Sequence, residues 1–222
     1  MMIGLIADIV QSRKLEKRDE IQMRLAACLK QVNETYQTSL ASNFTITLGD
    51  EFQALFKTPL RMFQALDEIT FAMYPVRLRY GIGLGEITTQ INPELSIGAD
   101  GPAYWYAREA IQSVHSNNDY GRTNIQVVME NPDEVLRLIN ELLKATAMIA
   151  NGWRATQIEV MRALLEQNIW TDKFDQVGLA KKLDISSSIL SQRMATSGIK
   201  LYLRGRGEAE VALERIHRRY AK

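Results

Sequence analysis

Hydrophobic and polar residues follow two different periods along the first 150 residues, and these periods separate strands from helices. The short apolar run 2–10 predicts a strand buried on both faces, whereas the period-two alternation of 43–48 predicts a half-buried strand. The predicted elements are strands at 2–10, 43–48, 51–57, 76–87 and 125–129, and helices at 18–38, 59–73, 101–111 and 132–150. The order β-α-β-β-α-β-α-β fits an α/β (α+β) fold, in which a split βαβ arrangement surrounds an antiparallel hairpin in one sheet.

The C-terminal third of the chain has a helical pattern. The dipeptide Asn151-Gly152 is a helix-ending signal and marks the expected domain junction. Beyond it, 155–167 places apolar residues on one helical face, and 177–194 has the spacing of two helices joined by a tight turn. We therefore expect an α/β domain at 1–130, a linking helix at 131–152 and an all-α domain at 153–222.

The composition excludes several classes of protein. With 46% hydrophobic and 24% charged residues among 222, the chain has globular composition. The single cysteine, Cys28, rules out an intramolecular disulfide and a cysteine-based metal site, and two histidines disfavour a histidine-rich one. The N-terminus lacks a signal-peptide pattern, and no apolar run reaches the roughly 18 residues of a membrane span. We expect a cytoplasmic protein without membrane association.

Charge is unevenly distributed although the formal net charge is only +1. From Asn151 onward there are 13 Lys/Arg against 8 Asp/Glu, while the preceding residues contain 14 basic and 18 acidic side chains. A basic module behind an acidic body is typical of nucleic-acid binding. An excess of this size also arises by chance, so charge alone leaves both readings open.

Asp8 and Asp50 are the sharpest candidates for chemistry. An acid inside an apolar strand costs several kcal/mol to bury unless it is paired or binds a metal. Asp50 follows a glycine at the tip of the predicted hairpin, which can lie beside the first strand. Two carboxylates at one end of a sheet suit Mg²⁺ or Mn²⁺ together with substrate phosphates. The alternative is that Asp50 is only a turn residue and that Asp8 is a cap or pairs with an arginine.

A polar, basic segment follows the first strand. Ser12, Arg13 and Lys14 can bind the phosphates of a nucleotide, or of another phosphorylated small molecule, beside the two acids. The alternative is a solvated charge run that precedes a helix. A second polar segment, 92–101, is long enough for a functional loop.

Four segments resemble the catalytic domain of class III nucleotidyl cyclases, and the hairpin also resembles that of GGDEF diguanylate cyclases. They are 5–10, 48–56, 76–87 and 101–108. The resemblance implies a ferredoxin-like palm, metal ligation by Asp8 and Asp50, a phosphate contact from Arg108 and a homodimer. Ile46 and Tyr104 stand where adenylyl cyclases have a purine-reading lysine and an asparagine, so the base-reading residues are missing.

The whole chain is also similar to the SatD family of bacterial proteins. This resemblance rests on 6–9 with Ser12-Arg13-Lys14 after it, on 47–53 and on 96–104. It spans nearly all the chain, but it implies no particular activity.

The segment 177–194 resembles bacterial helix-turn-helix units. Ser186 is placed to cap its second helix. That helix exposes the polar residues Ser187, Ser188, Ser191, Gln192 and Arg193, which can reach base edges and phosphates of DNA. Lys200, Arg204 and Arg206 follow and can contact the DNA backbone. The alternative is that this module serves dimerisation or binds another protein.

These observations favour a ligand-responsive, DNA-binding regulator, in which a cyclase-like domain senses a nucleotide and a metal ion. A second hypothesis is a metal-dependent nucleotidyl-transfer enzyme of the cyclase type. A third is a protein-interaction adaptor whose palm is degenerate.

Overall fold

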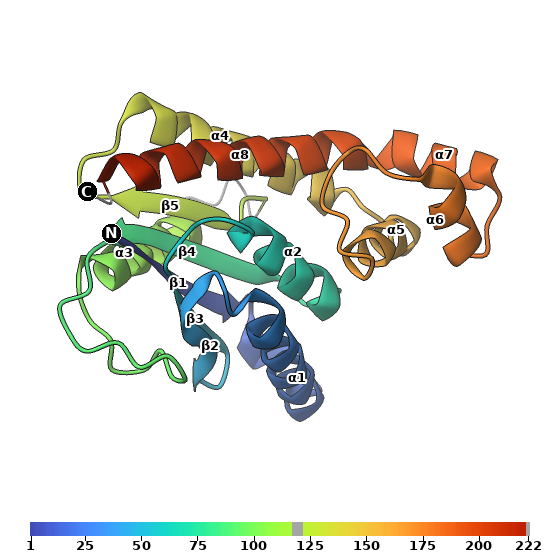
Figure 1. Ribbon diagram of the computed structural model, residues 1–222. Coiled ribbons are helices and arrows are strands. Elements are labelled where there is room, and N and C mark those ends of the chain that lie inside the picture. Colours follow the sequence, from blue (N-terminus) through green and yellow to red (C-terminus); the bar gives the residue numbers. More distant parts are fainter. Residues whose placement is uncertain (117–121, 221–222) are drawn as a thin grey trace.

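The computed structural model describes residues 1–116 and 122–220 and shows one sheet with helices on both of its faces (Figure 1). The elements up to the end of the sheet region are β1 (Met2–Ile9), α1 (Arg18–Tyr36), β2 (Leu40–Leu48), β3 (Glu51–Phe56), α2 (Met62–Met73), β4 (Leu78–Gly85), α3 (Pro102–Ser116), β5 (Ile125–Met129) and α4 (Glu134–Asn151). This is the predicted order, and the mixed α/β class is confirmed. β2 begins three residues earlier than expected, because shifts in its register with β3 break the period-two pattern there.

The sheet has the strand order β2-β3-β1-β4-β5. β1 pairs antiparallel with β3 on one side and β4 on the other, whereas β4 and β5 are parallel. Asp8, near the end of β1, lies opposite Glu51 in β3 and opposite Arg79 in β4. The topology therefore brings the end of β1, the tip of the β2–β3 hairpin and the start of β4 to one edge of the sheet.

One face of the sheet is covered closely by α3. Gly81 and Gly83 in β4 lie directly beneath this helix, where an added Cβ would come within 2.3 Å of the Ala107 carbonyl oxygen and 2.1 Å of the Ala103 carbonyl oxygen, respectively. Because no side chain fits in that space, the glycines of β4 allow the helix backbone to rest on the strand backbone. Alternate residues of a strand share a face, so Asp8 and Arg79 are on this same side.

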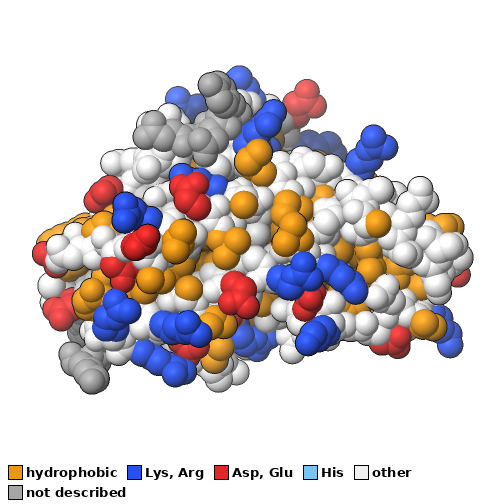
Figure 2. All heavy atoms as spheres, turned by 90° about the horizontal axis from the view of Figure 1, so that it is seen from above, with side chains coloured by type: hydrophobic (Ala, Val, Ile, Leu, Met, Phe, Trp, Pro, Cys, Tyr) orange, Lys and Arg blue, Asp and Glu red, His pale blue; other side chains and the backbone are white. Residues whose placement is uncertain are grey.

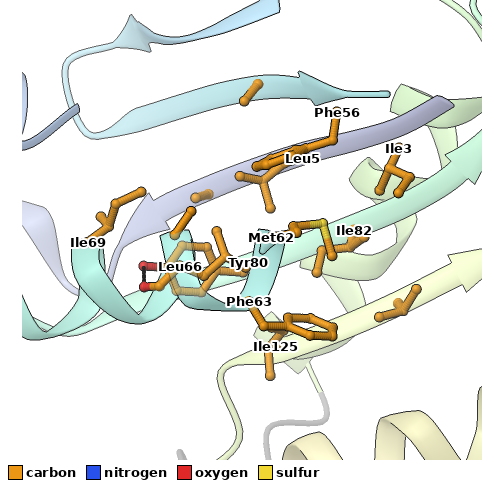
Figure 3. Packing of buried hydrophobic residues seen from close by; sticks show 14 of the residues in the cluster. Ile3, Leu5, Phe56, Met62, Phe63, Leu66, Ile69, Tyr80, Ile82 and Ile125 are labelled. Carbon is orange, nitrogen blue, oxygen red and sulfur yellow. Dashed lines mark hydrogen bonds between the residues drawn. The ribbon is translucent and has the colours of Figure 1, made fainter. Parts of the chain in front are cut away.

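The opposite face packs against α1 and α2 and forms the main hydrophobic core. Figure 3 shows the side chains that α2 and the strands contribute. They include Ile3 and Leu5 of β1, Phe56 of β3, Tyr80 and Ile82 of β4, Ile125 of β5, and Met62, Phe63, Leu66 and Ile69 of α2. The buried Tyr80 hydroxyl donates to the Leu66 carbonyl at 3.3 Å and lies 2.9 Å from the Thr70 hydroxyl. The Tyr80 hydroxyl is therefore hydrogen-bonded although it lies within the hydrophobic core.

The C-terminal region is helical, as predicted, and has a second hydrophobic cluster. Its helices are α5 (Ala155–Leu165), α6 (Gln176–Lys182), α7 (Ser187–Ser197) and α8 (Ile199–Tyr220). The Ser186 hydroxyl accepts a hydrogen bond from the Ile189 amide at 3.3 Å, which confirms the predicted cap of α7. Gly198 ends that helix with a φ of 62°, a left-handed conformation that favours glycine.

The long helix α8 belongs to both hydrophobic clusters. Its beginning contributes Tyr202 and Leu203 to the C-terminal cluster, whereas Leu213 and Ile216 pack in the core beside the sheet. Along its length α8 lies next to α4 (Figure 1). Gly205 makes this approach possible, because a Cβ there would lie 2.7 Å from the Thr146 methyl carbon.

A buried ion pair joins α8 to α2. Asp67 is fully buried, and its Oδ1 accepts from Arg206 Nη2 at 2.5 Å and from the Tyr202 hydroxyl at 2.6 Å. Its Oδ2 accepts from Trp170 Nε1 at 2.8 Å. We call these four residues the Asp67 network. The expectation that Arg206 contacts DNA is wrong, since its side chain is buried and bound to Asp67.

Seen from above, the face that carries α4 and α8 has hydrophobic side chains interspersed with charges of both signs (Figure 2). The exposed hydrophobic residues of α4 and α8 include Val135, Leu138, Met148, Leu201 and Val211. Within 1–116 and 122–220, none of the helices has the length and apolar character needed to cross a membrane.

Candidate functional site

The carboxylate of Asp8 is bound by an arginine on the neighbouring strand. Arg79 Nε donates to Oδ1 at 2.7 Å and Nη2 donates to Oδ2 at 2.9 Å, which is the bidentate geometry of a strong ion pair. Both side chains are largely buried, with 24% of Asp8 and 14% of Arg79 exposed. The acid inside the apolar strand is therefore paired with an arginine, the alternative that the sequence left open.

A second ion pair lies beside the first. Glu51 is opposite Asp8 on β3, and Arg108 reaches it from α3 with N–O distances of 2.8 and 3.3 Å. The Arg108 side chain is 47% exposed, so this contact is more accessible than the Asp8–Arg79 pair. Arg108, predicted to bind phosphate, lies at the rim of the sheet edge where the acids lie.

Asp50 and Ser12 meet at the same edge. The Ser12 hydroxyl donates to Asp50 Oδ2, and the Ile9 amide donates to the Asp50 carbonyl at 3.0 Å. Ser12 is buried in a short 3₁₀ turn, Ser12–Lys14, while Arg13 and Lys14 are exposed on it. The residues predicted for metal and phosphate binding in the first half of the chain thus gather at one end of the sheet.

The arrangement of these acids can be compared with the needs of Mg²⁺ or Mn²⁺. Such ions take several oxygen ligands at short distance, and Asp8 and Asp50 supply oxygens of the right type. Both oxygens of Asp8, however, accept from Arg79, and one oxygen of Asp50 accepts from Ser12. In the part of the chain that the structure describes, no three Asp, Glu, His or Cys side chains form a metal-binding group. As the residues lie, they do not form a ready metal site, because a cation would first have to displace Arg79.

A cavity of about 450 Å³ opens next to these ion pairs, between β1, β3, α3 and the loop before α3. We call it the Tyr104 cavity. Its lining comprises Ile6, Gln53, Ala99, Asp100, Tyr104, Trp105 and Arg108. The lining combines apolar and aromatic side chains with a few polar and charged ones, a combination common in small-molecule sites.

The Tyr104 hydroxyl is the unusual group of this cavity. It is buried, and among the described residues it has no hydrogen-bond partner. The Ser96 hydroxyl donates to the Gln53 carbonyl at 3.0 Å and lies close enough to the Tyr104 hydroxyl to lower its pKa, against the larger effect of burial. Burial raises the pKa of Tyr104, so the phenol stays neutral and retains a proton to donate. Unpaired buried hydroxyls are rare, and this one belongs to a residue that lines a cavity.

Trp105 forms the outer wall of the cavity. Its side chain is 56% exposed, and its Nε1 donates to Asp100 Oδ1 at 2.8 Å. The preceding loop is fixed by hydrogen bonds from Gln53 Nε2 to the Ser96 carbonyl at 2.6 Å and from the Thr88 amide to the Asp100 carbonyl at 2.9 Å. An exposed indole held in one orientation can stack on a planar ring.

Comparison with known proteins gives the family. The sequence model of the SatD family matches residues 2–213. The chain belongs to the SatD family. No curated protein matches this SatD-family chain.

Two solved structures, each titled as a bacterial light-regulated adenylyl cyclase, are similar to part of the SatD-family chain. The first is 13% identical over 57% of this chain and 42% of that one, with a TM-score of 0.42. The second is 14% identical over 57% of this chain and 74% of that one, also with a TM-score of 0.42. The SatD-family chain therefore covers less than half the length of the first structure.

The second candidate surface of the SatD-family protein is α7. Ser187, Ser188, Ser191 and Gln192 are all exposed, and their spacing places them on one side of the helix. Arg193 is less accessible, because its Nη1 lies 3.3 Å from Glu159 Oε2. Of the basic side chains nearby, Lys182 pairs with Glu166 and Arg204 pairs with Asp172. This surface is therefore polar, with much of its positive charge balanced inside the module.

Sequence reasoning missed two residues that shape the site. Arg79 was visible as a charged position among the glycines of β4, and the alternation of that strand could have placed it on the face of Asp8. Glu51 adjoins Asp50 in the hairpin. It lies opposite Asp8 of β1 and pairs with Arg108 of α3. The unpaired state of the Tyr104 hydroxyl depends on the packing around it, for which the sequence has no signal.

Proposed function

We propose that this SatD-family protein is a ligand-responsive DNA-binding regulator whose Tyr104 cavity binds a nucleotide or another phosphorylated small molecule with a planar ring. The observation that carries the proposal is the buried Tyr104 hydroxyl, which lacks a hydrogen-bond partner among the described residues and belongs to a side chain that lines the same cavity as Arg108. An unsatisfied buried hydroxyl costs about 1–3 kcal/mol, which a ligand acceptor at that point recovers.

The ion pair between Arg108 and Glu51 suits exchange with a phosphate. Because Arg108 is about half exposed, its pairing with Glu51 contributes little to stability. A phosphate offers the guanidinium the same bidentate geometry with more charge. Trp105 stands at the same rim and supplies a surface for a ring. Ring, phosphate and a hydrogen-bond acceptor together describe a nucleotide.

The palm is part of this proposal. The order β2-β3-β1-β4, with α1 and α2 on one face, is the arrangement expected for a ferredoxin-like palm of the cyclase type. Mg²⁺ or Mn²⁺ at Asp8 and Asp50 also remains a proposal. It requires Arg79 to leave Asp8, so it predicts that Arg79→Gln tightens Mn²⁺ binding, which titration calorimetry with the metal alone measures.

DNA binding by α7 is the other half of the proposal, with α5, α6 and α7 forming the helix-turn-helix module. The polar face of α7 and the net positive charge after residue 150 support it. The test is Gln192→Glu, which places a negative charge in that face, with Gln112→Glu on α3 as the matched control. Mobility-shift titrations with bacterial DNA at low salt should show at least tenfold weaker binding for Gln192→Glu alone. Absent binding by the native protein contradicts this half of the proposal.

The test of the ligand site is isothermal titration with ATP and GTP, each with Mn²⁺ and with EDTA. Native protein should bind, and both Tyr104→Phe and Arg108→Gln should weaken binding about fivefold or more. Asp50→Asn should weaken only the metal-dependent part. Unchanged binding in Tyr104→Phe and Arg108→Gln, or no binding by the folded native protein, contradicts the proposal.

A second candidate function is metal-dependent nucleotidyl transfer. The gathering of Asp8, Asp50 and Glu51 at one sheet edge favours it. Analysis of nucleotide products after incubation with Mn²⁺ decides between the two, since a regulator returns the nucleotide unchanged. A homodimer, which the cyclase resemblance implies, is tested by light scattering during size-exclusion chromatography. The third hypothesis, a protein-interaction adaptor, gains support if neither ligand nor DNA binds.

A further inference from the structure

A larger cavity lies on the other side of the sheet, at the junction of α1, α2 and α5. Its volume is about 710 Å³, which is within the range of small-molecule sites. α5 lies beside α2 there (Figure 1). The polar side chains of its wall include Arg24 and Gln31 of α1, Arg61 and Glu68 at α2, and Arg162 of α5. We call it the arginine cavity.

The three arginines of this cavity are hydrogen-bonded to neutral acceptors. Arg24 Nη2 donates to the Met73 carbonyl at 2.6 Å, and Arg162 Nε donates to the Phe71 carbonyl at 2.7 Å. Arg61 Nη2 donates to Asn168 Oδ1 at 2.7 Å, and its guanidinium carbon lies 4.6 Å from the centre of the Tyr36 ring. None of the three forms an ion pair within the described part of the chain.

The carboxylates of the lining do not balance this charge. Glu166 pairs with Lys182, outside the set of three arginines. Glu68 accepts from the Tyr36 hydroxyl, and burial raises its pKa against the opposing effect of Arg61, so it supplies at most one negative charge beside the three arginines. Burial also raises the pKa of the Cys28 thiol, to about 11, so this neighbour stays neutral. Three cationic side chains thus line this cavity together with one carboxylate that forms no ion pair among the described residues, although Arg24 itself is exposed to solvent.

Capping of α2 explains only part of this arrangement. Arg24 and Arg162 bind carbonyls at the C-terminal end of α2, where a cation is favoured by the helix dipole. A guanidinium has five N–H donors, however, and Arg24 uses one of them here. The three arginines come from different segments of the chain and line one cavity.

We propose that the arginine cavity is a second ligand site, specific for a small molecule that carries two or more negative charges. This site is independent of the Tyr104 cavity, because α1 and α2 cover the face of the sheet opposite α3. Its walls come from the sheet region and from α5, so an occupant bridges the two hydrophobic clusters. Binding should therefore stabilise the docking of the C-terminal helices on α1 and α2.

The experiment uses pyrophosphate and citrate as separate probes of the full-length protein, with titration calorimetry and thermal unfolding at low salt. The test variant is Arg24→Gln/Arg162→Gln. The matched control is Arg137→Gln/Arg218→Gln, which removes the same charge from exposed positions outside both cavities. Either probe should bind the native protein and raise its Tm, the test variant should lose at least tenfold in affinity, and the control should lose less than twofold. The stronger probe distinguishes a phosphate from a carboxylate ligand.

A second variant guards against a folding defect in the first. Ala72 lines the cavity and is exposed on α2, so Ala72→Trp adds bulk there without removing a charge. It should fold normally and lose at least fivefold in affinity for the same probe. Absence of binding to both probes overturns the proposal, as does binding that Ala72→Trp and the double arginine variant leave unchanged. ATP binding that needs Tyr104 but not Arg24 and Arg162 supports the proposed function without this second site.

Discussion

The protein has an ion pair between an arginine and an acid on each side of its sheet, and the two pairs differ in their exposure to solvent. On the α3 face, Glu51 and Arg108 meet at a rim where nearly half of the arginine is exposed. On the other face, Asp67 and Arg206 are fully enclosed between α2 and α8. A carboxylate–guanidinium contact at the rim can exchange partners, whereas the enclosed one cannot without opening the molecule.

The surroundings of each pair explain the difference. Asp67 accepts hydrogen bonds from Arg206, Tyr202 and Trp170, so both of its carboxylate oxygens are hydrogen-bonded. Beside the Glu51–Arg108 pair, by contrast, the Tyr104 hydroxyl has no partner among the described residues. A complete network fixes how two helices pack, and an incomplete one next to a cavity is suited to a ligand.

The largest effect should follow from breaking the enclosed pair. Asp67→Asn leaves the buried Arg206 charge uncompensated and should lower the free energy of unfolding by about 3–5 kcal/mol. Urea denaturation measures it, and Glu214→Gln, which breaks an exposed pair with Arg218 on the same helix, is the control. A loss below about 1 kcal/mol for Asp67→Asn contradicts a structural role for the network.

A second enclosed acid in the same region makes stability depend on pH. Glu210 of α8 accepts from the Phe63 amide at 3.2 Å, and burial raises its pKa to about 7. Because the folded state holds this proton more tightly than the unfolded state, stability is full below about pH 4.5 and is lost as pH rises through 7. The loss should be about 3 kcal/mol, since each pKa unit corresponds to about 1.4 kcal/mol.

A comparison of the native protein with Glu210→Gln isolates the contribution of Glu210 to the pH dependence of stability. His217 has a lowered pKa from burial, so it acts in the opposite direction, with stability lost as pH falls. The difference between the urea unfolding curves of native protein and Glu210→Gln, measured from pH 4 to 8, cancels the histidine contribution. A flat difference across that range contradicts the raised pKa of Glu210.

How far the sequence predicts the molecule differs between the same regions. The order of strands and helices followed from hydrophobic periods, and β4 was recognised from its run despite its glycines. The edge that holds Asp8, Asp50, Ser12 and Arg108 followed from the hairpin and from family resemblance. These features depend on residues close in sequence or on a repeated pattern, which is why they could be inferred.

Long-range packing was not predictable in the same way. Arg204 and Arg206 were predicted to contact the DNA backbone because they follow the expected helix-turn-helix. In the structure they are part of α8, where Gly205 faces Thr146 of α4 and Arg206 faces Asp67. The partners lie far away along the chain, so no local pattern distinguishes a buried arginine from an exposed one.

The smallest effect should come from two tyrosines that differ only in whether the hydroxyl is paired. Tyr80→Phe removes hydrogen bonds to Leu66 and Thr70 and should cost about 1 kcal/mol in the free energy of unfolding. Tyr104→Phe removes a hydroxyl that has no partner in the described structure, so stability should stay the same or rise by a few tenths of a kcal/mol. Urea denaturation of both variants without ligand measures the contrast. Equal losses in the two variants mean that the Tyr104 hydroxyl is already satisfied in the free protein, and the reason for placing a ligand acceptor in its cavity disappears.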